Sequence, residues 1–114
     1  TGAGRCMTNE GGEYRFTSVH PGSYPWQNHS NAWRPAHIHF SLFGSAFISH
    51  LVTQMYFPGD PLLPLDPVLG GVPEHARHLL IARYAHDVTE VGVALGYRFD
   101  IVLRGRDETP MEVR

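Results

Sequence analysis

Apolar and polar residues alternate along several short stretches of this chain. Residues 14–19 alternate over six positions, and residues 37–43 and 49–57 form apolar-rich runs that end in turn-forming residues. Residues 95–104 place aromatic and aliphatic side chains on one face and mostly charged ones on the other. The pattern therefore predicts four short strands, and one short helix over residues 74–83, where helix formers follow Pro73.

Glycine and proline separate these elements. Residues 8–12 contain turn-forming residues, and residues 23–36 and 58–73 are predicted to be loops. Residues 105–114 are predicted to be a polar tail or an intersubunit arm. Short strands with frequent turns predict a mainly β fold, an antiparallel β-sandwich with long loops. Because a sandwich normally needs more strands, we expect residues 1–114 to be the C-terminal part of a single domain whose N-terminal strands are missing.

The composition excludes some classes of protein. Hydrophobic residues make up 42% of the chain and the net charge is −2, with both signs interspersed. This balance is too apolar for a disordered chain, and it gives no indication of a nucleic-acid or membrane partner. The single cysteine, Cys6, excludes an internal disulfide and is consistent with a reducing, cytoplasmic location.

A His-x-His pair carries the clearest chemical signal. His37 and His39 leave the same face of a strand, where two imidazoles can converge on one metal ion. Ile38 and Phe40 leave the other face toward a core, and Pro35 favours extended backbone before the pair. The alternative is that two of the eight histidines of the chain fall here by chance.

A tyrosine upstream narrows the choice of metal. Tyr24 lies between two prolines in a tight turn, and phenolate with imidazole suits ferric iron. Zinc and ferrous sites prefer cysteine, histidine or carboxylate ligands, and no aspartate or glutamate lies near the histidine pair in the sequence. The residue types therefore favour non-haem Fe(III), although Tyr24 could also be a packing residue.

These motifs resemble the intradiol ring-cleaving dioxygenases. The resemblance covers nearly the whole chain and is weakest between residues 66 and 95. It rests on residues 4–6, Thr8, Gly12, 14–16, 21–26, Asn31, 33–40, 53–61 and 97–105.

The resemblance implies a ferric ion held by Tyr24, His37 and His39, with a second tyrosine ligand expected upstream of residue 1. Tyr14 is a weaker candidate, because it matches a strand position of the family. Tyr24 would be the displaceable axial ligand that accepts a substrate proton, His39 the other axial ligand and His37 an equatorial one.

The resemblance also assigns residues around the metal. Arg34 would stabilise negative charge on the substrate ring, Gln54 would lie near the substrate and oxygen pocket, and Trp26 would form a pocket wall. Tyr24, Arg34 and Gln54 are thus the expected catalytic residues, and Trp26, Arg34 and Gln54 the substrate-binding ones. Each has a structural alternative: Arg34 could pair with a carboxylate, Gln54 could be an exposed strand residue, and Trp26 could be a core aromatic.

The implied activity is O2-dependent cleavage of a catechol. The expected substrate is protocatechuate (3,4-dihydroxybenzoate), opened to 3-carboxy-cis,cis-muconate in aromatic catabolism. The implied partner is an α subunit in a large hetero-oligomer, with the active site at their junction. Catechol or hydroxyquinol as substrate, a non-catalytic subunit, and a β-sandwich binding module remain the alternatives.

Overall fold

The computed structural model describes residues 3–25, 33–44 and 51–112. The elements follow one another as β1 (Tyr24–Pro25), β2 (Trp33–Arg34), β3 (His37–Leu42), β4 (Leu51–Tyr56), the 3-10 helix η1 (Leu63–Leu65), α1 (Pro67–Gly70), the 3-10 helix η2 (Glu74–Leu80), β5 (Arg83–Tyr84), the 3-10 helix η3 (His86–Val88) and β6 (Tyr97–Arg98).

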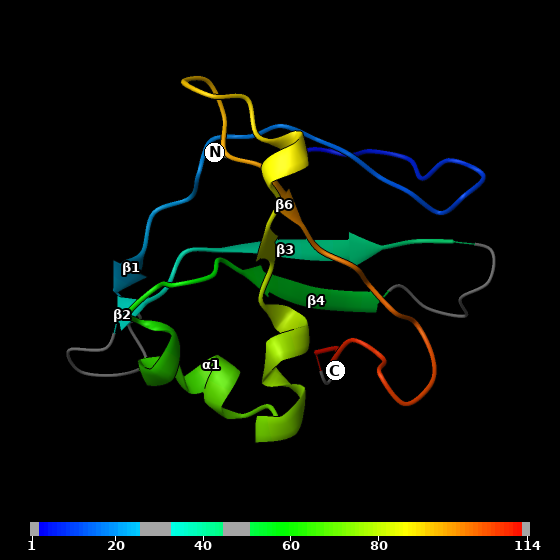
Figure 1. The fold of residues 1–114 in the computed structure, drawn as a ribbon. Coiled ribbons are helices and arrows are strands. Elements are labelled where there is room, and N and C mark those ends of the chain that lie inside the picture. The colour runs from blue at the N-terminus through cyan, green and yellow to red at the C-terminus, as the bar shows by residue number, and fades with distance from the viewer. Residues whose placement is uncertain (1–2, 26–32, 45–50, 113–114) are drawn as a thin grey trace.

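The described strands pair as three two-stranded antiparallel sheets, β1–β2, β3–β4 and β5–β6 (Figure 1). The predicted strands at 37–43 and 49–57 are confirmed as β3 and β4, although residues 45–50 lie outside the described part. The mainly β character with few short helices is confirmed. The sandwich arrangement stays a prediction.

The β3–β4 pair separates an apolar face from a polar one. Ile38 and Phe40 pack against a core cluster, as the alternation predicted, and Ile38 lies directly opposite Met55. The buried members of this cluster are Ala36, Met55, Phe57, Ala82 and Phe99. His37 and His39 therefore leave β3 on the side away from this core.

The strand predicted at residues 14–19 is wrong. This segment is irregular and mostly exposed, because alternation alone makes no ladder without a paired neighbour. Tyr14 and Phe16 instead pack against Phe40 in edge-on and tilted contacts, with ring centroids 5.8 and 6.0 Å from that ring. The Tyr14 hydroxyl donates to the Phe99 carbonyl at 2.6 Å. These side-chain contacts hold the segment against β3.

The Tyr14 hydroxyl gives a stability prediction. Tyr14→Phe leaves the Phe99 carbonyl without this partner, so the free energy of unfolding should fall by about 1–3 kcal/mol in urea denaturation. Tyr84→Phe, at an exposed tyrosine, is the matched control and should change it by less than about 0.5 kcal/mol. Equal effects of the two changes would show that the Tyr14 hydrogen bond contributes nothing.

The strand predicted at 95–104 is much shorter than expected. Only Tyr97–Arg98 pairs, with β5, because side chains satisfy the backbone on both sides of it. Thr89 Oγ1 accepts from the Gly96 amide at 2.9 Å, and Thr109 Oγ1 accepts from the Val102 amide at 2.8 Å. Two threonine hydroxyls thus replace the ladder that a longer strand would need.

The helical segments also differ from the prediction. Residues 58–73, predicted as a loop, contain η1 and α1, because Asp66 caps α1 by accepting from the Leu69 amide at 3.2 Å and Pro67 occupies the first turn. The helix predicted at 74–83 is the 3-10 helix η2, seven residues long. Such a short segment gains little from α-helical cooperativity.

The predicted polar tail packs on the domain. The Glu112 amide donates to the Val52 carbonyl at 2.8 Å, Thr53 Oγ1 donates to the Pro110 carbonyl at 2.7 Å, and Thr109 is buried. The prediction missed this because these contacts use mainly backbone groups of the tail, which leave no pattern in its side chains.

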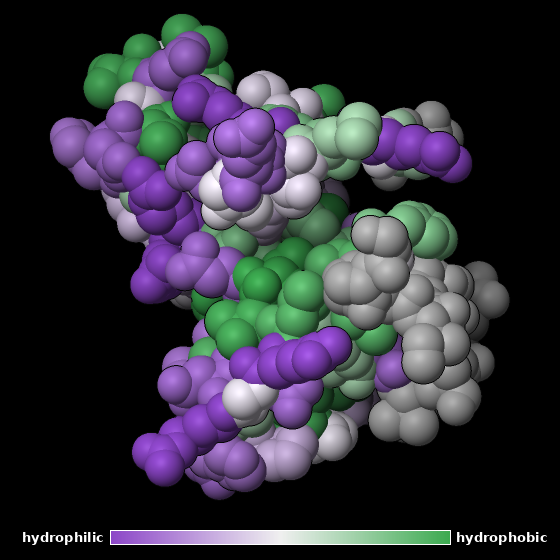
Figure 2. Space-filling view, turned by 90° about the vertical axis from the view of Figure 1, so that its right-hand side faces the viewer, coloured by the Kyte–Doolittle hydropathy of each residue, from purple (hydrophilic) through white to green (hydrophobic). Residues whose placement is uncertain are grey.

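Two surface properties complete the fold. Figure 2 shows hydrophobic residues forming a band across one face, between two hydrophilic regions. Within the described residues, no helix is long and apolar enough to cross a membrane.

Candidate metal centre and its arginine

The polar face of the β3–β4 pair brings four side chains together. The imidazoles of His37 and His39 have ring centroids 6.0 Å apart and lie at 65° to each other. Antiparallel pairing places Tyr56 opposite His37 and Gln54 opposite His39. The predicted histidine pair and Gln54 therefore share one face.

The hydrogen bonds of His37 define its tautomer, with the proton on Nδ1 and the lone pair on Nε2. Its Nδ1 lies 2.9 Å from the Pro35 carbonyl, to which it can only donate, and Arg34 Nη1 donates to Nε2 at 3.3 Å. Burial lowers the pKa of His37, the Pro35 contact opposes this, and the charges of Arg34 and His39 lower it further. A neutral imidazole fixed by a carbonyl at Nδ1 is the usual form of a metal-ligating histidine.

His39 is more exposed and meets the C-terminal tail. Its Nε2 lies 3.0 Å from Glu112 Oε1, and Gln54 Nε2 donates to the same oxygen at 2.8 Å. The sequence indicated no carboxylate near the histidine pair, and the folding of the tail onto β4 corrects this. Glu112 is a neighbour of the site that sequence reasoning missed.

Arg34 is buried at the centre of a polar network, with only 5% of its surface exposed. Its Nε donates to Asp66 Oδ1 at 3.0 Å and its Nη2 to Asp66 Oδ2 at 3.1 Å, a bidentate pair. Nη2 also lies 2.7 Å from Gln54 Oε1 and 2.8 Å from the Tyr56 hydroxyl. Arg34 therefore pairs with a carboxylate and also touches a predicted metal ligand.

Asp66 and Tyr56 were missed by sequence reasoning. The Tyr56 hydroxyl donates to Asp66 Oδ2 at 2.8 Å, and burial first, then the Asp66 carboxylate, raise its pKa. Burial alone would raise the pKa of Asp66, but hydrogen bonds from Arg34 and Tyr56 outweigh it and hold the pKa below its ordinary value. The Asp66-Pro67 pair signals a helix start, but nothing in the sequence links it to Arg34.

The lowered pKa of Asp66 predicts an acid-dependent loss of stability. A depressed folded-state pKa contributes stability that is complete above the unfolded value and disappears as the pH falls through the folded value. The difference in unfolding free energy between wild type and Asp66→Asn should therefore be constant above about pH 5 and shrink below about pH 4. Denaturant titration at several pH values measures it, and a difference that grows with acid would contradict the assignment.

The remaining predicted residues are placed only in part. The backbone of Tyr24 pairs with Arg34 in the β1–β2 sheet, and its side chain is outside the described atoms. Trp26 lies outside the described residues. Tyr14 packs on Phe40 at the opposite face of β3, and burial, then the charges of Asp100 and Cys6, raise its pKa to about 12, which disfavours a phenolate ligand.

The histidine pair alone does not form a complete metal site in the described part of the chain. In the described part of the chain, no three His, Cys, Asp or Glu side chains are placed to hold a metal ion. Any further protein ligand beside His37 and His39 must therefore be another residue type, or lie outside the described atoms. Tyr24 stays a prediction, because the structure describes only its backbone pairing with Arg34.

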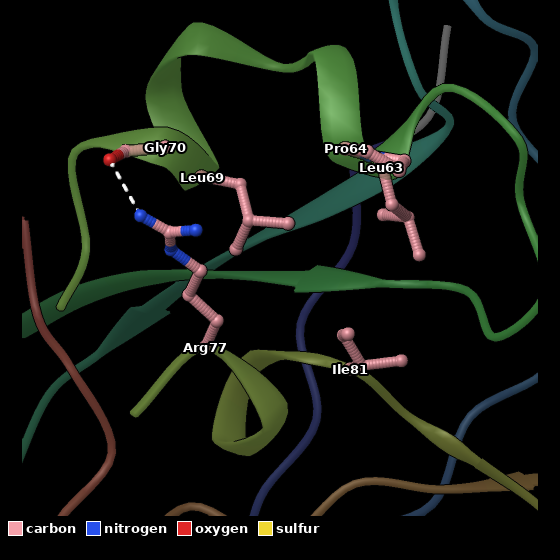
Figure 3. Close-up of a pocket in the computed structure, with 6 residues that line it drawn as sticks. All are labelled: Leu63, Pro64, Leu69, Gly70, Arg77 and Ile81. Carbon is pink, nitrogen blue, oxygen red and sulfur yellow. Dashed lines mark hydrogen bonds between the residues drawn. The ribbon is translucent and has the colours of Figure 1, made fainter. Parts of the chain in front are cut away.

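A separate pocket of about 200 Å³ lies among η1, α1 and η2 (Figure 3). It is lined mainly by aliphatic side chains, and Arg77 Nη2 there donates to the Gly70 carbonyl at 3.0 Å. No residue predicted for the metal centre lines it. Its lining residues are Leu63, Pro64, Leu69, Gly70, Arg77 and Ile81.

Comparisons with known proteins give one consistent family. A family model described as a dioxygenase matches residues 1–105. The protocatechuate 3,4-dioxygenase beta chain of Burkholderia cepacia is 69% identical over 111 residues, which are 97% of this chain and 47% of that protein. A chlorocatechol 1,2-dioxygenase of Rhodococcus opacus is 36% identical over 75 residues, 55% of this chain and 29% of that protein. The chain thus spans less than half the length of these relatives.

Proposed function

Because this chain belongs to the intradiol dioxygenase family, we propose that it is the C-terminal part of the iron-bearing subunit of a protocatechuate 3,4-dioxygenase. The proposed reaction uses O2 to break the ring bond between the two hydroxylated carbons and yields 3-carboxy-cis,cis-muconate, which retains both oxygen atoms. The observation that carries the proposal is the His37 ring, which donates from Nδ1 to the Pro35 carbonyl, so that Nε2 carries the lone pair. In this structure the lone pair accepts from Arg34 Nη1, and a bound metal would take the place of this hydrogen bond.

Tyr24, His37 and His39 are the proposed protein ligands in this chain, completed by a tyrosine from elsewhere in the full-length protein. Two imidazoles with phenolates fit ferric iron better than zinc. Although Glu112 lies beside His39, the described residues contain no set of three His, Cys, Asp or Glu side chains placed to hold a metal, as a ferrous facial triad would need. Ferric iron held by these residues would supply Lewis acidity toward the oxygens of a catechol substrate.

The residues of this chain have separate roles in the proposed reaction. The Tyr24 phenolate accepts a proton from the substrate. The buried guanidinium of Arg34 offers a fixed positive charge beside His37, where it stabilises negative charge that develops on the substrate ring. Gln54 lies opposite His39 on the same face of the β3–β4 pair and is proposed to line the substrate and oxygen pocket. Trp26 is proposed as a wall of that pocket.

The proposed assembly is a hetero-oligomer with an α subunit. The 69% identity to a chain named as a beta chain supports such a partner. Recognition of the substrate carboxylate would then come partly from residues outside this chain. A cytoplasmic location is proposed on the single cysteine and the small catecholic substrate.

The substrate is tested by oxygen uptake with the full-length protein and its partner. Protocatechuate should give the highest kcat/KM, and the product should be the carboxymuconate by mass and absorbance. Higher kcat/KM with catechol or hydroxyquinol would favour the alternative, which the chlorocatechol relative supports. No uptake with any catechol would leave a non-catalytic subunit or a binding module.

A further inference from the structure

Arg34 is a long, flexible side chain that lies in one defined place. Both edges of its guanidinium are used: Nε and Nη2 face Asp66, and Nη1 faces His37. The carboxylate of Asp66 is buried, with 2% of the residue exposed. A buried carboxylate in bidentate contact fixes both the position and the plane of a guanidinium.

Asp66 is itself held from three directions. Its Oδ2 accepts from the Tyr56 hydroxyl at 2.8 Å and from the Leu69 amide at 3.2 Å, and its backbone carbonyl accepts from the Gly70 amide at 2.8 Å. Asp66 lies at the junction where η1 ends and α1 begins, near β2, which carries Arg34 (Figure 1). The carboxylate is therefore anchored in the fold independently of Arg34.

Tyr56 connects this anchor to the histidine face. Its hydroxyl accepts from Arg34 Nη2 at 2.8 Å while it donates to Asp66, and it lies opposite His37 in the β3–β4 pair. Tyr56 is fully buried. In the described residues, every buried side-chain nitrogen and oxygen has a hydrogen-bond partner, so the network is complete.

We propose that Asp66 is the positioning residue for Arg34: its buried carboxylate, steadied by the Tyr56 hydroxyl, fixes the guanidinium beside His37 and Gln54. This inference rests on the proposed function, because it assigns Asp66 a role in the same reaction. Asp66 touches neither substrate nor metal and acts only through Arg34. A change at Asp66 that lets the Arg34 guanidinium move should lower kcat more than it raises KM. The reason is that misplacing a catalytic group by about 1 Å can cost on the order of 100-fold in rate.

The test compares Asp66→Asn with Asp100→Asn in the full-length, iron-loaded assembly. Asparagine keeps the size and the capping ability of Asp66 but removes the charge. Asp100 is the matched control, because it also pairs with an arginine at 3.0 Å but at an exposed position. Asp66→Asn should lower kcat by about 10- to 100-fold, with KM changed less than about threefold and iron content retained. Asp100→Asn should behave as wild type.

A double-mutant cycle separates positioning from general damage. In an Arg34→Met background, Asp66→Asn should change kcat by less than about twofold, because the group through which it acts is gone. The same fold loss in both backgrounds, or a wild-type kcat for Asp66→Asn alone, would overturn the proposal. If Asp66→Asn does not fold, Tyr56→Phe should show the same pattern, and a wild-type kcat for Tyr56→Phe would then overturn it.

Thermal unfolding of the same variants needs no turnover. In the wild-type background, Asp66→Asn should lower the melting temperature. In the Arg34→Met background it should leave the melting temperature unchanged or raise it, because there it removes a buried carboxylate that has lost its arginine partner. Additive shifts would contradict the coupling. A wild-type protein without iron or turnover would contradict the proposed function alone, and the thermal cycle would still decide whether Asp66 holds Arg34.

Discussion

Replacing His37 by alanine is expected to remove bound iron, visible colour and ring cleavage together. His37 holds a fixed, neutral imidazole on the polar face of β3. Because it is one of three proposed ligands in this chain, its loss should weaken iron binding severely. The prediction is tested by iron content per subunit, the visible spectrum and oxygen uptake with protocatechuate in the full-length assembly. Turnover should fall to the level of the assay without enzyme.

The control is His75→Ala, at an exposed histidine in η2. It should keep full iron content and turnover, because nothing in the proposed site touches it. An His37→Ala protein that keeps stoichiometric iron and its colour would show that the metal, if present, is held elsewhere. Loss of folding in His37→Ala would be detected by circular dichroism, and His37→Gln, which retains a polar side chain, would then replace it.

Exchanging Arg34 for lysine is expected to lower kcat by about 100- to 1,000-fold while iron remains bound. Lysine keeps the positive charge but cannot reproduce the fork that reaches Asp66 and His37 at once. A fixed donor at developing negative charge is worth about this factor. The effect should appear in kcat, because the charge on the ring develops only as the reaction proceeds.

Arg83→Lys is the matched control, since Arg83 pairs with Asp100 at an exposed position. It should leave kcat within about twofold of wild type, because exposed pairs contribute little. An Arg34→Lys protein with wild-type kcat and raised KM would assign Arg34 to substrate binding. If kcat and KM were both unchanged in Arg34→Lys, Arg34 would have no role in the reaction.

The strands around the histidine pair could be predicted from local pattern. Alternation placed His37 and His39 on one face and Ile38 and Phe40 on the other, and the structure has them so. The segment at 14–19 has an equally clear alternation and forms no strand. Alternation shows only that side chains of one kind recur at every second residue. A segment becomes a strand only when its backbone also forms hydrogen bonds with a neighbouring strand.

The residues that surround Arg34 and the histidine pair from distant parts of the chain were not predictable. Arg34 and Asp66 are 32 residues apart, and the contact exists because η1 and α1 fold a predicted loop back toward β2. Glu112 reaches His39 only because the tail binds the backbone of β4. Such contacts depend on long-range packing, which the order of residue types in one segment does not encode.

The most direct test of the ferric site is the visible absorption spectrum of the full-length assembly, with iron assay and a protocatechuate titration. A red-brown protein with a broad charge-transfer band, one iron per proposed site and a band shift on adding protocatechuate is the predicted result. A colourless protein, or zinc in place of iron, would contradict a ferric–tyrosinate centre built on Tyr24, His37 and His39.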